Sequence, residues 1–280
     1  MMNATKDYAV TMFGITALQM PTLVSIAPKE SILFNFKRWG FPFNMERQFM
    51  KEHIAFSPVN VFAGRFQTLF TSVYYHTDDQ HLLQNMTVLA AAGLPVHKRV
   101  GRLHFLYIFH GGGFFGNLGM WLHCLILQYV LMPSAVTDLQ KLPSSTSNIF
   151  VKICEDKFSE SIGMLNIGIT CYGSSAGVHA ILSFGACCSA ERIVKRLREC
   201  LAQHCLELDV YFFTDLFNVL FTIRLFSNDV AGVISSFLAE NGFFGQLTKS
   251  GHVIGYAGHV AGSFFGVAYY YFKYIRNQLA

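Results

Sequence analysis

The sequence predicts an all-α, polytopic membrane protein whose six membrane-spanning helices form one domain, residues 1–280. Charged residues make up only 14% of the chain and hydrophobic residues 52%, which leaves too little polar surface for an ordinary soluble domain. The mean hydropathy is accordingly positive, at +0.36. Disordered and strongly nucleic-acid-binding proteins are excluded by this apolar composition and by a net charge of only +4.

Six stretches are long and apolar enough to be membrane spans, for which about 20 mostly apolar residues are needed. Five of them contain no Asp, Glu, Lys or Arg, whereas Asp215 and Arg224 interrupt the fifth in chain order. The predicted spans are Tyr8–Pro28, Gln80–His97, Leu103–Thr137, Ser161–Ala190, Val210–Phe226 and Ser250–Phe272.

The first span is expected to be a retained helix, because Met1–Asp7 lacks the basic segment that precedes the apolar region of a signal peptide. The long connection at about 29–75 mixes charges with aromatic residues, which is typical of a segment lying along the membrane interface. Between the third and fourth spans, Pro143–Asn148 has the composition of a loop. No internal repeat divides the chain.

Positive charge gathers in the two short connections that follow the second and fourth spans. These residues are Lys98, Arg99, Arg102, Arg192, Lys195, Arg196 and Arg198. Six crossings return the chain to its starting side, so both connections lie on the face that carries the termini. The positive-inside tendency places this face in the cytosol or its topological equivalent.

The seven cysteines are odd in number and include no CxxC pair, so neither a disulfide framework nor a zinc ribbon is indicated. They are expected to act as small apolar residues. The histidines show no metal-ligand spacing and no HExxH motif. The sequence therefore predicts neither a metal nor another cofactor.

Polar side chains within the predicted spans mark the candidate site, because such groups are costly in lipid. His81 and Asn85 lie one helical turn apart at the start of the second span, Gly173–Gly177 lies in the fourth, and His259 lies in the sixth. Spans two, four and six run in the same direction, so the three groups are expected at a similar depth, opposite the basic connections. A hydroxyl, an imidazole and side-chain donors at one depth indicate acyl transfer.

Together, these motifs resemble those of the rhomboid intramembrane serine proteases, over about Arg65–Tyr271. His81-Leu-Leu-Gln-Asn85 is similar to the family's HxxxN signature, and His76 lies five residues before it, where the family has another histidine. Gly173-x-Ser175 resembles the family's GxS nucleophile motif.

The last motif of the family is a histidine followed by glycines at +3 and +7, which His259, Gly262 and Gly266 resemble. The two glycines also have the GxxxG spacing that allows close helix packing, and packing alone would explain them. His252, in a similar Gly-His-Val-Ile-Gly, has no glycine at +7, whereas His259 has glycines at both +3 and +7 and a full span after it, so His259 is the preferred base.

The resemblance implies a Ser-His dyad in which Ser175 is the nucleophile and His259 the base, with no acidic third member evident. Ser175 is preferred to Ser174 because Gly173 lies two positions before it. His81, Asn85 and the backbone N–H of Ser175 would stabilise the oxyanion.

Partners and location also follow from the resemblance. The implied substrates are transmembrane helices in the lipid bilayer, with small or helix-breaking residues near the cut, and no nucleic acid is involved. The fifth span and the connection Asn241–Gly245 would form a lateral gate. Gly64–Thr71 is similar to organellar, mitochondrial-type members, which implies the mitochondrial inner membrane, with a secretory-pathway membrane as the alternative.

Two positions depart from the family pattern. Gln67 and Thr68 stand where a Trp-Arg pair is often found, which puts the usual anchoring of the first loop in doubt. His179 stands four residues after the nucleophile, where a tyrosine often packs on the catalytic histidine. The ring contact is expected to survive this exchange.

Two other classes of function remain open. Gly173-Ser174-Ser175-Ala176-Gly177 also matches GxSxG, and Asp209, Asp215 or Asp229 followed by His259 gives the residue order of a soluble α/β-hydrolase. The charge-free spans argue against this alternative. A catalytically silent rhomboid-like protein that binds membrane helices is the non-enzymatic alternative.

Overall fold

The computed structural model describes residues 3–26, 45–76, 79–126, 173–203, 209–238 and 255–276, and within these ranges every regular element is a helix. The all-helical prediction is thus confirmed for this part of the chain. The long helices are α1 (Ala4–Ile26), α6 (Asp79–Val100), α7 (Arg102–Ile126), α10 (Ser175–Gln203), α11 (Val210–Leu238) and α12 (Tyr256–Tyr270), which the π-helix η3 (Tyr271–Ile275) extends. The short ones are α3 (Arg47–His53), α4 (Pro58–Phe62), α5 (Thr68–Thr71) and the 3-10 helix η1 (Ser72–Tyr74).

Each predicted span overlaps one long helix, but two of the helices extend well beyond the predicted ends. α10 continues past Ala190 to Gln203, because the charged residues that end an apolar span do not end a helix. α11 continues past Phe226 to Leu238, because Asp229 and Ser236 face the bundle and find partners there. The loop at 143–148 and the connection at 241–245 lie outside the described residues.

By length and hydropathy, one helix in the described ranges qualifies as a candidate membrane span. It is Val210–Ser236 of α11, with a mean hydropathy of 1.3. Of its most apolar 18-residue stretch, 11% is buried within the protein. This segment overlaps the span that the sequence indicated least clearly. The number of six spans therefore stays a prediction.

The polarity of α11 is reversed relative to that of a helix on a water-soluble protein. Four polar residues spaced by seven, about two helical turns, face the bundle: Asp215 is 7% exposed, Thr222 8%, Asp229 6% and Ser236 3%. The exposed side is largely apolar and includes Phe217 and Leu220 at 68% and 56%. Arg224 is also exposed. An apolar outer face around a polar inner stripe is expected of a helix in lipid.

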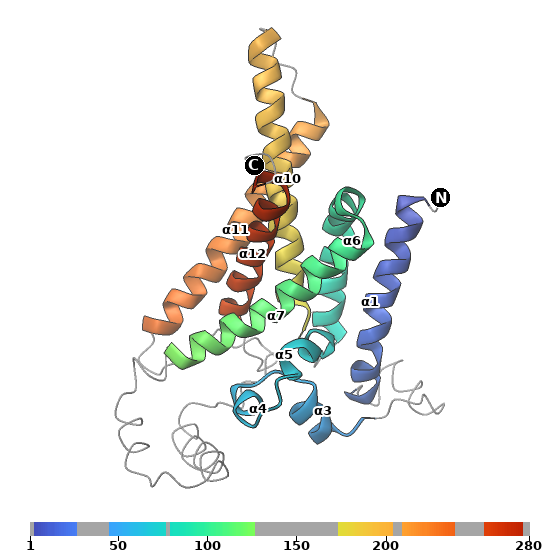
Figure 1. The fold of residues 1–280 in the computed structure, drawn as a ribbon, viewed down its shortest axis with the longest axis vertical. Helices are drawn as coiled ribbons and strands as arrows, with labels where there is room; N and C mark the ends of the chain where they lie inside the picture. Colours follow the sequence, from blue (N-terminus) through green and yellow to red (C-terminus); the bar gives the residue numbers. More distant parts are fainter. Residues whose placement is uncertain are drawn as a thin grey trace.

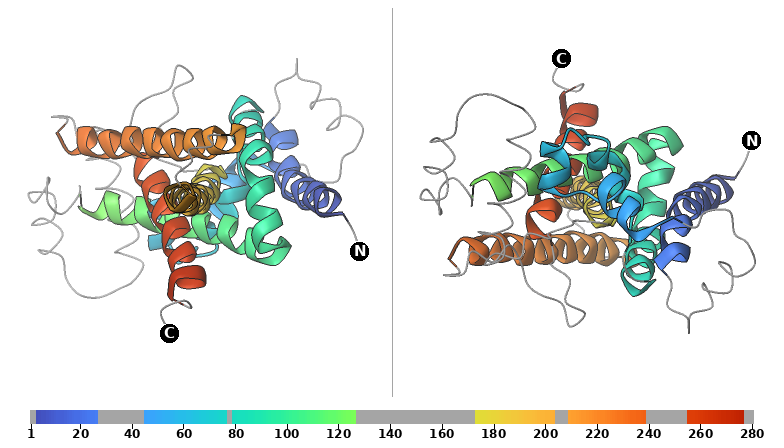
Figure 2. Two further views of the ribbon diagram at one scale, coloured as in Figure 1. Left: turned by 90° about the horizontal axis from the view of Figure 1, so that it is seen from above. Right: turned by 90° about the horizontal axis from the view of Figure 1, so that it is seen from below.

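α10 occupies the centre of the bundle and packs against α6, α7, α11 and α12 (Figure 2). α1 lies at the periphery, against α6. Figure 1 shows that α6, α10 and α12 all begin at the lower end of the molecule, where α5 also lies, and run upward. The sequence predicted this common direction for the three helices that carry the candidate site residues.

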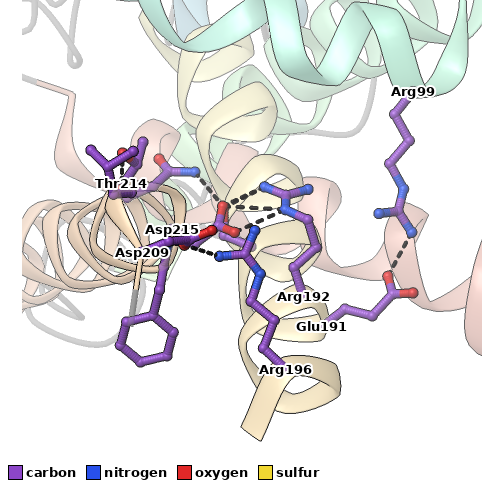
Figure 3. Close-up of polar contacts among 11 residues, drawn as sticks. Arg99, Glu191, Arg192, Arg196, Asp209, Thr214 and Asp215 are labelled. Carbon is purple, nitrogen blue, oxygen red and sulfur yellow. Dashed lines mark hydrogen bonds and ion pairs between the residues drawn. The ribbon is translucent and has the colours of Figure 1, made fainter. Parts of the chain in front are cut away.

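The opposite end of the bundle is fastened by ion pairs between helices (Figure 3). Arg192 of α10 binds both carboxylate oxygens of Asp215 on α11, at 2.6–3.2 Å. Arg196 binds Asp209 at 2.6 Å, and Arg99 of α6 binds Glu191 at 2.5 Å. Arg99 and Arg192 therefore join helices, and Arg196 joins α10 to the residue before α11, in addition to any role in membrane orientation.

The part of the first connection that the structure describes is a folded cap next to α5. Phe56 and Met50 are fully buried there. The Asn60 amide donates to the carbonyls of Lys51 and Ala55, each at 2.8 Å. Thr71 donates to the carbonyl of Ile54 at 2.9 Å. These bonds anchor the loop without the Trp-Arg pair that the sequence lacks.

Candidate active site

Ser175 and His259 come together where α10 and α12 begin. Ser175 is the first residue of α10, and His259 lies in the first turn of α12. Nε2 of His259 is 2.9 Å from Oγ of Ser175, within hydrogen-bond distance. A hydroxyl and an imidazole that are 84 positions apart in the chain thus share a proton.

Gly173 shapes the turn that presents Ser175. Its φ of +103° is rarely adopted by residues with a side chain, and its N–H donates to the carbonyl of Ser72 at 3.0 Å. A Cβ at this position would lie only 2.7 Å from Cε1 of His81. The first glycine of the GxS motif is therefore required by both the backbone conformation and the space.

Gly262 and Gly266 let α12 approach the backbone of α10. A Cβ on Gly262 would lie 2.3 Å from the carbonyl oxygen of Ala176, and one on Gly266 would lie 2.2 Å from that of Ala180. Backbone atoms cannot move aside as a flexible side chain can. The two glycines therefore set the distance between the helices, and with it the distance between Ser175 and His259.

Replacing Gly262 by alanine is expected to lower the free energy of unfolding by about 1–3 kcal/mol, the usual cost of overpacking. The added methyl group would push α12 away from the Ala176 carbonyl. Thermal unfolding in detergent measures the effect. Gly14→Ala on α1 is the matched control, because a Cβ there meets no atom within 4 Å. Equal melting temperatures for the two variants would contradict the close-approach role.

A carboxylate also contacts His259, although no acidic third member was evident in the sequence. Oδ1 of Asp229, on α11, lies 3.0 Å from Nδ1 of His259. A carboxylate only accepts hydrogen bonds, so Nδ1 carries the proton and Nε2 is left to accept one from Ser175. The signal in the sequence was an acidic residue inside an apolar helix. It was missed because the predicted span ended before Asp229.

His179, on the second turn of α10, packs face to face on His259, with ring centroids 4.2 Å apart and an interplanar angle of 10°. The ring contact expected of the usual tyrosine is thus present. Nδ1 of His179 lies 2.8 Å from the carbonyl oxygen of Ser175. Nε2 lies 3.2 Å from Oδ2 of Asp229, so one carboxylate contacts two histidines.

The residues expected to stabilise an oxyanion lie around the same turn. Nδ2 of Asn85 and Nε2 of His76 are 3.3 Å apart, and the rings of His76 and His81 meet edge to face at 5.2 Å. The backbone N–H of Ser174 donates to Nε2 of His76 at 3.4 Å. His76 thus connects the start of α6 to the turn that carries Ser175.

His179, Asp229 and His259 also offer ligand-type atoms within 4.8 Å of one another. An ion bound by imidazole lies close to the plane of the ring, at about 2.0–2.1 Å for zinc. The two rings here are stacked in nearly parallel planes, so one ion cannot lie in both. The arrangement fits proton sharing better than metal binding.

Other candidates from the sequence lie apart from this group or outside the described ranges. Ser174 is fully buried and its hydroxyl finds no hydrogen-bond partner within the described ranges, whereas the neighbouring Ser175 reaches His259. His252 lies outside the described residues. Cys124, Cys187, Cys188 and Cys200 are free thiols.

Comparison with known proteins finds a matching family model. Residues 63–131, which include His81 and Asn85, match the family model of the Rhomboid domain, and this confirms the predicted resemblance. The match ends before Ser175 and His259, and it does not establish an organellar type. No curated protein and no solved structure matches the chain. The matched segment makes this part of the chain similar to the Rhomboid domain, a domain that implies an integral membrane protein.

Proposed function

We propose that this protein is an intramembrane serine endopeptidase that cleaves transmembrane helices. The observation that carries the proposal is the 2.9 Å contact between Oγ of Ser175 and Nε2 of His259 in a rhomboid-type chain. A nucleophile hydrogen-bonded to a base that a third group orients is the signature of activated serine enzymes.

The proposed reaction proceeds through an acyl-enzyme. Oγ of Ser175 attacks the carbonyl carbon of the scissile peptide while His259 takes the hydroxyl proton. His259 then protonates the leaving amine, the C–N bond breaks, and an ester to Ser175 remains. Water hydrolyses this ester with His259 again acting as base, which restores the enzyme.

The oxyanion formed in both halves of the reaction requires donors. We assign this role to the side chains of His81 and Asn85 and to the backbone N–H of Ser175. At the first residue of α10, this N–H has no carbonyl one helical turn earlier within the helix to bind it. Removing one oxyanion donor typically costs about 10²–10³ in kcat.

The reversed polarity of α11 supports a substrate that approaches through lipid. The outer face of this helix is suited to a bilayer, and its inner face carries Asp229 against the base. A helix in the bilayer would reach the site sideways past α11, as the expected lateral gate requires. Small or helix-breaking residues near the cut would free a peptide bond from its own helical hydrogen bonds.

For the location, we propose a multi-pass protein of the mitochondrial inner membrane. The support is the resemblance of Gly64–Thr71 to organellar members, and a secretory-pathway membrane is the alternative. Import of the full chain into isolated mitochondria, followed by carbonate extraction, distinguishes the two.

The test of function uses the wild-type chain reconstituted in liposomes with a fluorescent transmembrane reporter that has a Gly-Pro pair in its apolar segment. We expect cleavage within that segment, located by mass spectrometry, and slower cleavage when leucines replace the pair. Fluorophosphonate labelling without cleavage would indicate another serine hydrolase. The absence of both would indicate a silent helix-binding protein and contradict the proposal.

A further inference from the structure

We infer that Asp229 is a positioning residue for His259, and that docking of α11 against α10 and α12 thereby completes the site. The inference deepens the proposed function and rests on it. The carboxylate lies on α11, whereas the nucleophile and the base lie on α10 and α12. Catalytic competence then depends on the position of a helix that carries neither reacting group.

The first step of the argument concerns the tautomer of His259. With its proton on Nδ1 and bound to Asp229, the ring presents an unprotonated Nε2 to Ser175. Without the carboxylate, the other tautomer would place a proton on Nε2, where it cannot accept one from the serine. Asp229 also limits rotation of the ring away from Oγ of Ser175.

The second step concerns what holds Asp229 in place. Nδ1 of His179 faces the Ser175 carbonyl, which only accepts, so this nitrogen carries a proton. Nε2 of the same ring lies 3.2 Å from Oδ2 of Asp229, so the second carboxylate oxygen contacts a side chain of α10. Asp229 is therefore attached to α10 through His179 and to α12 through His259.

The third step concerns how α11 itself is held. Its contacts on either side of Asp229 are also polar: Asp215 binds Arg192 of α10, and Ser236 lies 3.1 Å from Nε2 of His123 on α7. Lipid supplies no hydrophobic force to press an apolar helix against its neighbours, so such contacts matter for docking. An outward shift of about 1 Å would break the bond between Asp229 and His259, and misplacement of that size can cost about 10²-fold in rate.

The experiment compares Asp229→Asn, Asp229→Glu and the wild-type chain in liposomes. We expect Asp229→Asn to lower kcat by about 10²–10⁴-fold, as for loss of the carboxylate in other serine enzymes, with KM unchanged. Asp229→Glu, which restores the carboxylate, is expected to regain part of this loss. The control is Asp209→Asn, which removes an exposed carboxylate just before α11. It is expected to leave kcat unchanged, because an exposed ion pair such as the one between Asp209 and Arg196 contributes little to docking.

Thermal unfolding in detergent separates positioning from folding. A purely structural role predicts a lower melting temperature with unchanged kcat per folded molecule. Normal kcat in Asp229→Asn overturns the inference, and so does equal loss in folded Asp229→Asn and Asp229→Glu. If Asp229→Asn does not fold, kcat in Asp229→Glu decides: near-wild-type activity supports the inference, and activity as low as that of a Ser175→Ala chain overturns it.

A double-mutant cycle tests the link to docking. Asp215 lies 14 residues from Asp229, about 21 Å along the helix, and its substitution by asparagine weakens the attachment to Arg192. We expect Asp215→Asn to lower kcat several-fold when Asp229 is present and to have no further effect in Asp229→Asn. Additive effects would overturn the coupling. A wild-type chain that neither cleaves nor labels would instead contradict the proposed function.

Discussion

Replacing Ser175 by alanine is expected to abolish cleavage of a transmembrane reporter, with a fall in kcat of about 10⁴–10⁶-fold. The change removes the only atom that forms the ester, so no acyl-enzyme can arise. Folding is expected to survive, because alanine suits a helix and the lost contact is the one to His259. Reporter cleavage in liposomes and thermal unfolding in detergent measure the two effects.

The control for this variant is Ser174→Ala. Ser174 is adjacent in the chain and fully buried, but its hydroxyl meets no hydrogen-bond partner among the residues that the structure describes. Its removal is expected to leave cleavage within about twofold of wild type, because a surplus buried hydroxyl contributes little. If Ser174→Ala lost cleavage while Ser175→Ala kept it, the nucleophile would have been assigned to the wrong serine.

Replacing His259 by alanine is expected to eliminate labelling of the protein by a fluorophosphonate probe. The probe reacts with an activated serine hydroxyl, and activation here depends on Nε2 of His259, 2.9 Å from Oγ of Ser175. The variant also removes the contacts to Asp229 and His179. In-gel fluorescence of the purified, reconstituted chain measures the labelling, independently of any choice of peptide substrate.

His252→Ala is the matched control for the base, since it removes a histidine from a similar Gly-His-Val-Ile-Gly seven residues earlier. Labelling is expected to persist in this variant. Undiminished labelling of His259→Ala would show that another group activates Ser175, and the assignment of the base would be wrong.

Much of the helical architecture could be predicted because membrane helices have a simple sequence pattern, a long apolar stretch with few charged residues. Charge-free stretches locate apolar helices, and each predicted span overlaps a helix in the described ranges. The order of crossings also predicted that the helices carrying His81, Ser175 and His259 run in one direction, as Figure 1 shows for α6, α10 and α12.

The limits of the helices and their lateral partners were less predictable. A span was expected to end where polar residues begin, but Asp229 is tolerated in α11 because it meets His179 and His259. Hydropathy describes each segment by itself, so it cannot show that a polar residue is paired with a side chain on another helix. Asp215 weakened the prediction of the fifth span for the same reason, since its partner Arg192 lies on α10.

Asp229 was also missed for a second reason. It could be recognised only by combining the order of the residues in the chain with the spacing of polar residues along one helix. The order Ser175, Asp229, His259 pointed only to a soluble α/β-hydrolase, which the Rhomboid match and the all-helical described ranges do not favour. The seven-residue spacing of Asp215, Thr222, Asp229 and Ser236 would have identified one buried face of a single helix.

The inward polar stripe of α11 also bears on how the chain is made. On the scale derived from translocon insertion, one aspartate near the centre of a span costs about 2.5–3.5 kcal/mol, so α11 entering the bilayer alone would be penalised for Asp229. α10 is synthesised earlier and carries both His179 and Arg192, the partners of the two aspartates. Biogenesis is therefore favoured when α10 is retained beside the translocon until α11 arrives and the two integrate as a hairpin.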